Sequence, residues 1–430
     1  MMDVSIRNWM FLGIAFLRCL VDILAQLFGD FSMKYVVLVG DGMGDYPVES
    51  LGNKTPLQAA DCPTMRTFAA LGETRMVQTV PEGMPPGSDV ANLALLGYDA
   101  AKNYTGRAPI EAAGAEIPMT PQDVAFRCNL VTVVDGVMDD YSAGHITTEE
   151  GRALIASVQE KLGREGLTFH PGVQYRHLLV WNGGPAECAC MPPHEIADKP
   201  VAGHLPAGER QGEIRELMEL SKAVFAGHPV NLKRIAEGKK PATQIWLWGQ
   251  GNAMQLESYK TLYGLGGGVI SAVDLLKGIA KLAGLEAPDV EGATGFLDTN
   301  YQGKVDAAFE ILEREDFVFV HIEAPDECGH MGDAQKKTFA IEEFDAKVCA
   351  PVFQWLEERG EEYTLMLCTD HRTPVALKGH TSEPVPMAVM KGPVGEQNAQ
   401  AAFDEDVNAG NAHCMACEWI QQILNASSER

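Results

Sequence analysis

Seven side chains in this 430-residue sequence have the types that bind divalent metals and transfer phosphoryl groups. They are three aspartates, three histidines and one serine, namely Asp41, Ser88, Asp326, His330, Asp370, His371 and His380. Carboxylate oxygen together with imidazole nitrogen suits Zn, Mn, Co or Fe, whereas a purely oxygen set suits Mg or Ca. Seven ligands are too many for one ion, and paired ions about 3.5–4 Å apart are typical of phosphoryl-transfer enzymes. The set therefore predicts metal-assisted phosphoryl or sulfuryl transfer at a two-metal site.

Ser88 is the candidate nucleophile of this set. It follows Pro85-Pro86-Gly87 and precedes a helical pattern over 89–96, so it lies near a helix N-terminus, where free N–H groups favour an attached phosphate. A free hydroxyl is a weak nucleophile, and metal coordination is one way to activate it. A lone serine before a helix is usually an N-cap, and a lone aspartate after a strand is often a turn residue. The hypothesis therefore depends on the seven residues together.

Three short apolar runs must position these side chains. They cover residues 35–39, 317–321 and 363–367, and each continues into a loop that carries ligand-type residues. Continuous apolar runs of this length are typical of buried parallel strands. Open α/β sheets bind ligands at the carboxyl ends of such strands. With helical patterns over 89–96, 271–282 and 338–356 between them, the runs predict an α/β fold with a mostly parallel sheet.

The middle of the chain has a different pattern. From 121 to 254 the strand-like segments (125–134, 177–181 and 244–248) are isolated, and joins rich in glycine and proline separate them. This part carries none of the three acidic loops. We therefore predict an inserted α+β domain over 121–254 and a metal-binding core built from 33–120 and 255–430.

Residues 1–32 form an N-terminal extension whose segment 9–28 is apolar but contains Arg18 and Asp22. A spanning helix needs about 20 residues with few or no charges. No small-residue cleavage site follows it cleanly. We interpret Met33 as the native start, directly before the first core strand, and do not expect a membrane partner. An interfacial amphipathic helix is the alternative that stays open.

Bulk composition excludes some classes of partner. Apolar residues make up 46% and charged residues 22%, as in ordinary soluble globular proteins. The formal net charge of −25 disfavours nucleic acid and anionic membrane surfaces, and an anionic substrate would need local cations. The ten cysteines form no repeated framework, and the single CxxC at Cys414 and Cys417 is a weak metal or redox signal. Reduced thiols favour a cytoplasmic location; a homo-oligomer is left open.

The motifs around these residues resemble those of the alkaline phosphatase superfamily. They are Asp41-Gly42, the Ser88 segment, Asp326-x-x-Gly-His330, Thr369-Asp370-His371 and Gly379-His380. Within the superfamily the sequence is similar to the archaeal-type, cofactor-independent phosphoglycerate mutases, through segments 87–93, 105–112, 175–181 and 298–304. The likeness runs from Met33 into the C-terminal region. It implies an α/β/α sandwich of the alkaline phosphatase type with an inserted α+β domain.

The resemblance also implies a division of the ligands. Asp41, Ser88, Asp370 and His371 would hold one ion, and Asp326, His330 and His380 the other. In this family the metals are usually manganese, with zinc, cobalt or magnesium as variants. The implied reaction interconverts 3-phosphoglycerate and 2-phosphoglycerate through a phosphoserine at Ser88, without a bisphosphoglycerate cofactor.

A mutase of this kind must keep water from the phosphoserine and must hold a carboxylate. An inserted domain that closes over the site would exclude water. Arginine suits the carboxylate, because its guanidinium binds two oxygens at once. We expect Arg107, Arg176 and Lys304 to contact the substrate because they lie in the family-like segments, and His145 is a further candidate.

Two other functions compete with this hypothesis. One is a hydrolase of the same fold that acts on a phosphate or sulfate ester. The other is a non-catalytic, membrane-tethered binding protein, against which the complete ligand set argues. The glycines of Gly40-x-Gly42-x-Gly44 do not indicate a dinucleotide site, because the third glycine comes one position early for that fingerprint.

Overall fold

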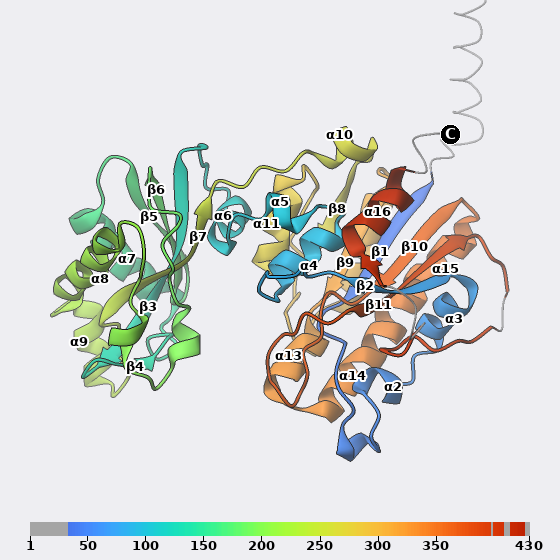
Figure 1. The fold of residues 1–430 in the computed structure, drawn as a ribbon, viewed down its shortest axis with the longest axis horizontal. Coiled ribbons are helices and arrows are strands. Elements are labelled where there is room, and N and C mark those ends of the chain that lie inside the picture. The colour runs from blue at the N-terminus through green and yellow to red at the C-terminus, as the bar shows by residue number, and fades with distance from the viewer. Residues whose placement is uncertain (1–32, 397–398, 408–412, 426–430) are drawn as a thin grey trace, which may run out of the picture.

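The computed structural model describes residues 33–396, 399–407 and 413–425, so the predictions about residues 1–32 lie outside the described residues. The described chain forms two lobes, each built around its own sheet (Figure 1). Within the described residues no helix is both long and apolar enough to cross a membrane. The nine cysteines of these residues are all free thiols, including Cys414 and Cys417.

The larger lobe contains a seven-stranded sheet with the order β12-β2-β11-β10-β1-β9-β8. Its strands are β1 (Lys34–Gly40), β2 (Glu73–Gln78), β8 (Gly267–Ile270), β9 (Phe317–Ile322), β10 (Tyr363–Cys368), β11 (Val385–Gly392) and β12 (Cys414–Met415). Only β11 runs antiparallel to its neighbours, β10 and β2. The three predicted strands are β1, β9 and β10, which lie side by side and parallel. The predicted α/β fold with a mostly parallel sheet is confirmed.

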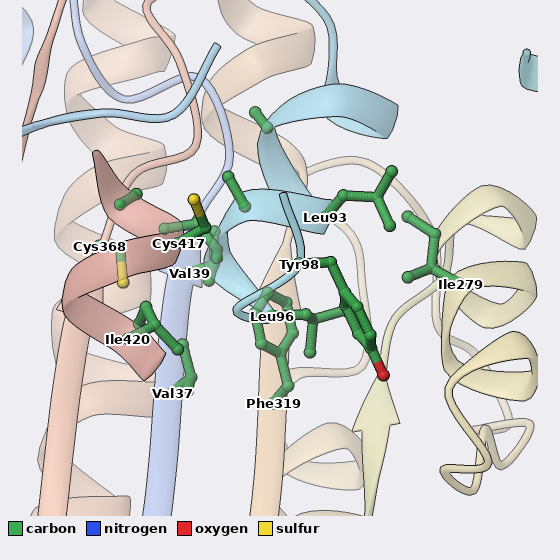
Figure 2. Packing of buried hydrophobic residues seen from close by; sticks show 14 of the residues in the cluster. Val37, Val39, Leu93, Leu96, Tyr98, Ile279, Phe319, Cys368, Cys417 and Ile420 are labelled. Carbon is green, nitrogen blue, oxygen red and sulfur yellow. The ribbon is translucent and has the colours of Figure 1, made fainter. Parts of the chain in front are cut away.

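Helices cover both faces of this sheet. The helices of this lobe are α2 (Pro56–Ala59), α3 (Pro63–Leu71), α4 (Ser88–Leu95), α5 (Ala100–Asn103), α10 (Tyr259–Tyr263), α11 (Asp274–Leu282), α12 (Tyr301–Leu312), α13 (Ala324–Met331), α14 (Ala334–Phe344), α15 (Ala350–Arg359) and α16 (Ala416–Asn425), while α6 (Arg107–Gly114) packs between α11 and the sheet of the smaller lobe. Because side chains alternate along a strand, Val37 and Val39 of β1 pack under α4, α11 and α16 (Figure 2). Val36 and Leu38 pack on the opposite face, against α3, α12 and α14. The sheet is therefore buried on both sides, as its continuous apolar strands require.

The smaller lobe contains a five-stranded antiparallel sheet in the order β4-β3-β6-β5, with β7 also paired to β3. Its elements are β3 (Asp123–Val134), β4 (Val137–Asp140), α7 (Thr148–Leu162), β5 (Leu167–Val173), β6 (Arg176–Asn182), α8 (Gln211–Phe225), α9 (Pro229–Ala236) and β7 (Gln244–Asn252). The lobe has its own apolar core, which includes Phe126, Leu154 and Trp246. The boundaries 121 and 254 stay predictions.

Candidate two-metal active site

Strand register brings the predicted ligands together. Val39 of β1 pairs with Cys368 of β10 and with His321 of β9, so the three strands end at the same edge of the sheet. Asp41 follows the end of β1, and Asp370 and His371 follow the end of β10. Residues from three distant parts of the chain therefore meet at one edge.

The chain continues from β9 into α13, which carries Asp326 and His330. Gly42 lets the β1 loop pass close to this helix: its φ is +60°, and a Cβ there would lie 2.6 Å from Oδ1 of Asp326. The Gly42 N–H donates to Oδ1 of Asp370 at 3.0 Å. Any side chain at position 42 would thus be strained and would also displace a ligand.

Ser88 is the first residue of α4, and Gly87 occupies the N-cap position. The N-cap alternative is therefore wrong for Ser88 itself. Its Oγ lies 3.2 Å from Nε2 of His371. Asn92, one turn further along α4, donates to the carbonyl of Ser88 and to Oδ2 of Asp370, both at 2.9 Å. The serine is thus held against the ligands of the β10 loop.

Two groups of atoms at short spacing result. In the first group, Nε2 of His371 lies 3.6 Å from Oδ1 of Asp41, 3.4 Å from Oδ2 of Asp370 and 3.2 Å from Oγ of Ser88. The groups adjoin, because the rings of His371 and His380 are 4.1 Å apart between centroids.

The second group contains Asp326, His330 and His380. Nε2 of His330 lies 3.1 Å from Oδ2 of Asp326 and 3.0 Å from Nε2 of His380. Nε2 of His380 in turn lies 3.4 Å from Oδ1 of Asp326. All seven predicted ligands are therefore brought together at this edge of the sheet, and their division between two ions stays a prediction. Another combination, Asp326 with His371 and His380, also places its ligand atoms within 4.8 Å of one another.

These spacings fit divalent cations. Ligands bound at about 2.0–2.1 Å around one tetrahedral or octahedral ion lie roughly 3.0–3.4 Å from each other. Oδ1 of Asp41 is buried and has no hydrogen-bond partner, although such groups are almost always paired in proteins. A cation supplies the missing partner, and the mixture of oxygen and nitrogen donors suits Mn, Zn or Co.

Hydrogen bonds behind two of the histidines fix which ring nitrogen faces the cluster. Nδ1 of His330 lies 3.1 Å from the carbonyl of Lys378, which can only accept. Nδ1 of His371 lies 3.2 Å from Oγ1 of Thr373, and the hydroxyl of Thr373 already donates to Asp326. Both Nδ1 atoms must therefore carry hydrogen. The Nε2 lone pairs are left free for a metal, as in most metal-binding histidines.

The electrostatics show an excess of negative charge. Burial, followed by the charges of Asp370 and Asp326, raises the pKa of the Asp41 carboxyl well above its usual range. The bond to Asp326 raises the pKa of His330 to about 9. Protons are thus held where a divalent cation would otherwise balance the carboxylates.

His321 belongs to the same cluster, although the sequence analysis did not select it. It is fully buried, and its Nε2 lies 3.0 Å from Oδ2 of Asp41. Its ligand atom, with those of Asp41 and Asp370, forms a second set lying within 4.8 Å. A histidine inside an otherwise apolar strand, directly before the acidic loop, was the available signal.

The predicted substrate contact Arg107 lies at the start of α6 and joins a cluster of arginines. Its Nε lies 3.2 Å from Glu111, whose other oxygen lies 3.0 Å from Nε of Arg127 on β3. Arg127 is buried and stacks on the ring of Trp248, with 4.3 Å from Cζ to the ring centroid. Sequence reasoning missed Arg127, although a charge in the middle of an apolar strand is unusual.

Arg107 and Arg127 lie close enough to His194 for their charges to affect its pKa. Burial first, and then the charges of Arg127, Arg107 and His330, lower the pKa of His194 to about 4. The predicted contact Arg176 is exposed, with its guanidinium 5.7 Å from the ring of Tyr175. The cations that an anionic substrate needs are therefore present despite the net charge of −25.

The other two predicted contacts lie differently. Lys304 is fully buried on α12, and its ammonium donates to the carbonyl of His321 at 3.3 Å. Burial lowers the pKa of Lys304 to about 8. His145 is exposed after β4 with a φ of +49°, and its backbone N–H donates to Oγ of Ser142. The structure thus places the ammonium of Lys304 beside the backbone of β9 and His145 on the surface of the smaller lobe.

Comparison with known proteins agrees with this geometry. The family model described as 2,3-bisphosphoglycerate-independent phosphoglycerate mutase matches residues 69–231. A protein of that name from Methanosarcina mazei is 50% identical over 375 residues, which cover 87% of this chain and 94% of the relative. A relative from Geobacter sulfurreducens with the same name, marked probable, is 50% identical over 378 residues, with the same coverage.

Two solved structures share the fold. The PH0037 protein from Pyrococcus horikoshii aligns with a TM-score of 0.75 at 26% identity, over 93% of this chain and 98% of that one. The cofactor-independent phosphoglycerate mutase from Thermoplasma acidophilum aligns with a TM-score of 0.61 at 24% identity, over 92% and 100%. Together with the relatives at 50% identity over most of both chains, these findings establish that the chain belongs to the 2,3-bisphosphoglycerate-independent phosphoglycerate mutase family.

Proposed function

We propose that this protein is an isomerase that interconverts 3-phosphoglycerate and 2-phosphoglycerate without bisphosphoglycerate, through a phosphoserine at Ser88. One observation carries the proposal: the Ser88 hydroxyl lies 3.2 Å from His371, beside two adjacent sets of metal-type ligands. Relatives that share half of their residues with this chain are named for this activity.

Two divalent ions are part of the proposal. Asp41, Ser88, Asp370 and His371 hold one ion, and Asp326, His330 and His380 hold the other. When bound, such ions activate a hydroxyl and neutralise the charge of the transferred phosphoryl group. We propose manganese for both, with zinc, cobalt or magnesium as alternatives, because the donors mix oxygen and nitrogen.

Ser88 performs the transfer. Its Oγ attacks the phosphorus of 3-phosphoglycerate, the bond from phosphorus to the C3 oxygen breaks, and the hydroxyl proton of Ser88 passes to that oxygen. Because Ser88 is the first residue of α4, the backbone N–H groups at this end of the helix face the phosphoryl group. Glycerate then turns, its C2 hydroxyl attacks the phosphoserine, the bond from phosphorus to Oγ of Ser88 breaks, and the proton of the C2 hydroxyl passes to that Oγ.

Positive side chains hold the rest of the substrate. We propose that Arg107, with Arg127 beside it, binds the glycerate carboxylate, because both contact Glu111 and both, like His330, lie close enough to His194 to lower its pKa. Arg176 and His145 contribute from the exposed face of the smaller lobe. Lys304 neutralises part of the charge of the phosphoryl group from beside the backbone of β9, where its ammonium contacts the carbonyl of His321.

Exclusion of water separates this reaction from hydrolysis. We propose that residues 121–254 form the inserted domain that covers the site. A separate sheet and core, both formed within this part of the chain, support that division. Closure of this lobe over the phosphoserine would leave the glycerate hydroxyl as the acceptor. A cytoplasmic location and the lack of a nucleic-acid partner also stay predictions, based on thiol content and charge.

The direct test follows both products of one reaction. Purified protein reloaded with Mn²⁺ is incubated with 3-phosphoglycerate, while coupled enolase detects 2-phosphoglycerate and a second assay detects free phosphate. We expect 2-phosphoglycerate with only a small fraction of free phosphate. Steady release of phosphate without 2-phosphoglycerate would show a hydrolase of the same fold and refute the mutase.

A further inference from the structure

The cluster of metal-type ligands contains a buried imidazole, that of His321, which is not a ligand in the two-ion arrangement proposed above. His321 lies near the end of β9 and is 0% exposed, and Asp41 beside it is 1% exposed. Nε2 of His321 and Oδ1 of Asp41 are both buried without a hydrogen-bond partner. Two orphaned polar atoms in one cluster are unusual, because buried polar groups are nearly always paired.

The carboxylate of Asp41 lies between two imidazoles. Its Oδ1 is 3.6 Å from Nε2 of His371, and its Oδ2 is 3.0 Å from Nε2 of His321. The second distance is short, but the two atoms are not aligned as a hydrogen bond. It falls within the spacing of two donors on one ion and is similar to the distances within the two groups described above.

The ring of His321 is oriented like those of His330 and His371, the two histidines whose Nε2 lone pair was assigned above. In His330 and His371, Nδ1 contacts an oxygen outside the cluster and Nε2 faces the carboxylates. In His321, Nδ1 lies 3.3 Å from Oγ of Ser271, and Nε2 faces Asp41. Oγ of Ser271 already accepts the N–H of Val273 and has a second lone pair for an Nδ1 hydrogen.

The backbone around the ring is fixed, since the ammonium of Lys304 donates to the His321 carbonyl. Nε2 of His321 therefore faces the carboxylates from a backbone that is held in place.

We propose that His321 is a metal ligand, whose Nε2 holds the ion of the Ser88 group together with Asp41 and Asp370. This inference rests on the two-metal function proposed above. Ser88 and His371 would complete the set of residues that hold this ion.

Titration of the metal-free, full-length protein with Mn²⁺ by calorimetry tests the inference. We expect two sites in the wild type. In His321→Ala and His321→Gln, the affinity of one site falls about 10–100-fold and the other is unchanged. Gln can replace an Nε2–H donor but supplies no imidazole nitrogen, so both variants lose the same affinity. The visible spectrum of the Co²⁺-loaded protein also changes in both.

His177→Gln is the matched control. His177 is also buried with an unpartnered Nε2, but its Nδ1 accepts the N–H of Gly172, and it lies on β6 of the smaller lobe. This variant loses an imidazole from the core of the smaller lobe but keeps every metal-binding atom of the site. We therefore expect the Mn²⁺ affinities of both sites to stay at the wild-type value. Circular dichroism establishes that each variant is folded.

If the His321 variants do not fold, Ser271→Ala replaces them as the test. It removes the partner of Nδ1 and leaves the ring in place, so we expect the affinity of that site to fall by about tenfold, the lower end of the range for such partners. Unchanged affinities in all variants would overturn the inference. Wild-type affinity in His321→Gln with loss in His321→Ala would also overturn it, because His321 would then serve as a hydrogen-bond donor to Asp41. A wild type that binds no Mn²⁺ would instead refute the proposed function.

Discussion

The two lobes contribute to the proposed site in different ways. At the edge of the larger sheet, buried and half-buried ligand atoms lie 3.0–3.6 Å from each other, and contacts with backbone and side-chain oxygens hold two of the histidines in place. Among the proposed substrate contacts on the smaller lobe, Arg127 is buried and packed, whereas Arg176 and His145 are exposed. We expect the first region to form without a substrate and the second to gain its contacts when substrate binds. Chemistry and recognition should therefore fail separately when residues are changed.

Ser88→Ala should have the largest effect. Removal of the nucleophile should lower kcat by about 10⁴-fold or more, while the fold is kept, because Ser88 is not the cap of α4. Enolase-coupled turnover and thermal melting measure the two quantities. Mutase activity near the wild-type value in this variant would contradict the covalent mechanism.

Asp326→Asn should remove the second ion and lower activity to a similar extent. Asp326 contacts both His330 and His380, and it accepts the hydroxyl of Thr373. Metal content measured after dialysis should fall by one ion per chain. Asp333→Asn is the control, because asparagine also caps helices and position 333 caps α14. Equal metal content in both variants would break the assignment.

Metal affinity of the larger lobe should depend on pH. The bond to Asp326 raises the pKa of His330 to about 9, so below that pH a metal must displace a proton. Apparent Mn²⁺ affinity should therefore fall about tenfold for each pH unit from 9 towards 6, if one proton is released. Titrations at four pH values measure this slope. A flat profile would show that His330 binds no metal.

Arg127→Gln should separate recognition from chemistry. We expect KM for 3-phosphoglycerate to rise about 10–100-fold, since a charged partner of a carboxylate is lost, while Mn²⁺ affinity is unchanged. Arg210→Gln is the control, because Arg210 also stacks on a tryptophan, Trp181, but is partly exposed and bound to Glu213. A loss of metal affinity in Arg127→Gln would contradict the separation of the two regions.

His145→Ala should have the smallest effect. The side chain is exposed, and exposed contacts at a rim contribute little to binding. KM should rise no more than about threefold, with kcat unchanged. A fall in kcat of tenfold or more would place His145 in the chemistry and would join the two regions that the comparison separates.

The sequence was informative about the larger lobe for a physical reason. Ligand-type side chains at the ends of three apolar strands can meet only if the strands are parallel neighbours, and β1, β9 and β10 are. The helix entry at Pro-Gly-Ser88 was also readable, although Gly87 and not the serine takes the cap position. The seven ligand candidates and the fold class thus followed from local patterns.

Residues whose role depends on packing were harder to find. His321 and Arg127 lie inside apolar strands, where a single polar residue does not change the pattern that predicts the strand. Their partners, Asp41 and Glu111, are distant in sequence or on another element. The region predicted as one helix over 338–356 also contains a π-helical turn, Asp345–Cys349, between α14 and α15.

The central claim is that the phosphoryl group passes through Ser88 and returns to glycerate. Rapid mixing of the Mn²⁺-loaded protein with 3-phosphoglycerate, followed by acid quenching and mass spectrometry of the peptide that contains Ser88, tests it most directly. We predict one added phosphoryl group on Ser88 within the first turnover, and none in Ser88→Ala or after chelation. Formation of 2-phosphoglycerate with no phosphoryl group on Ser88 at any time would contradict the account.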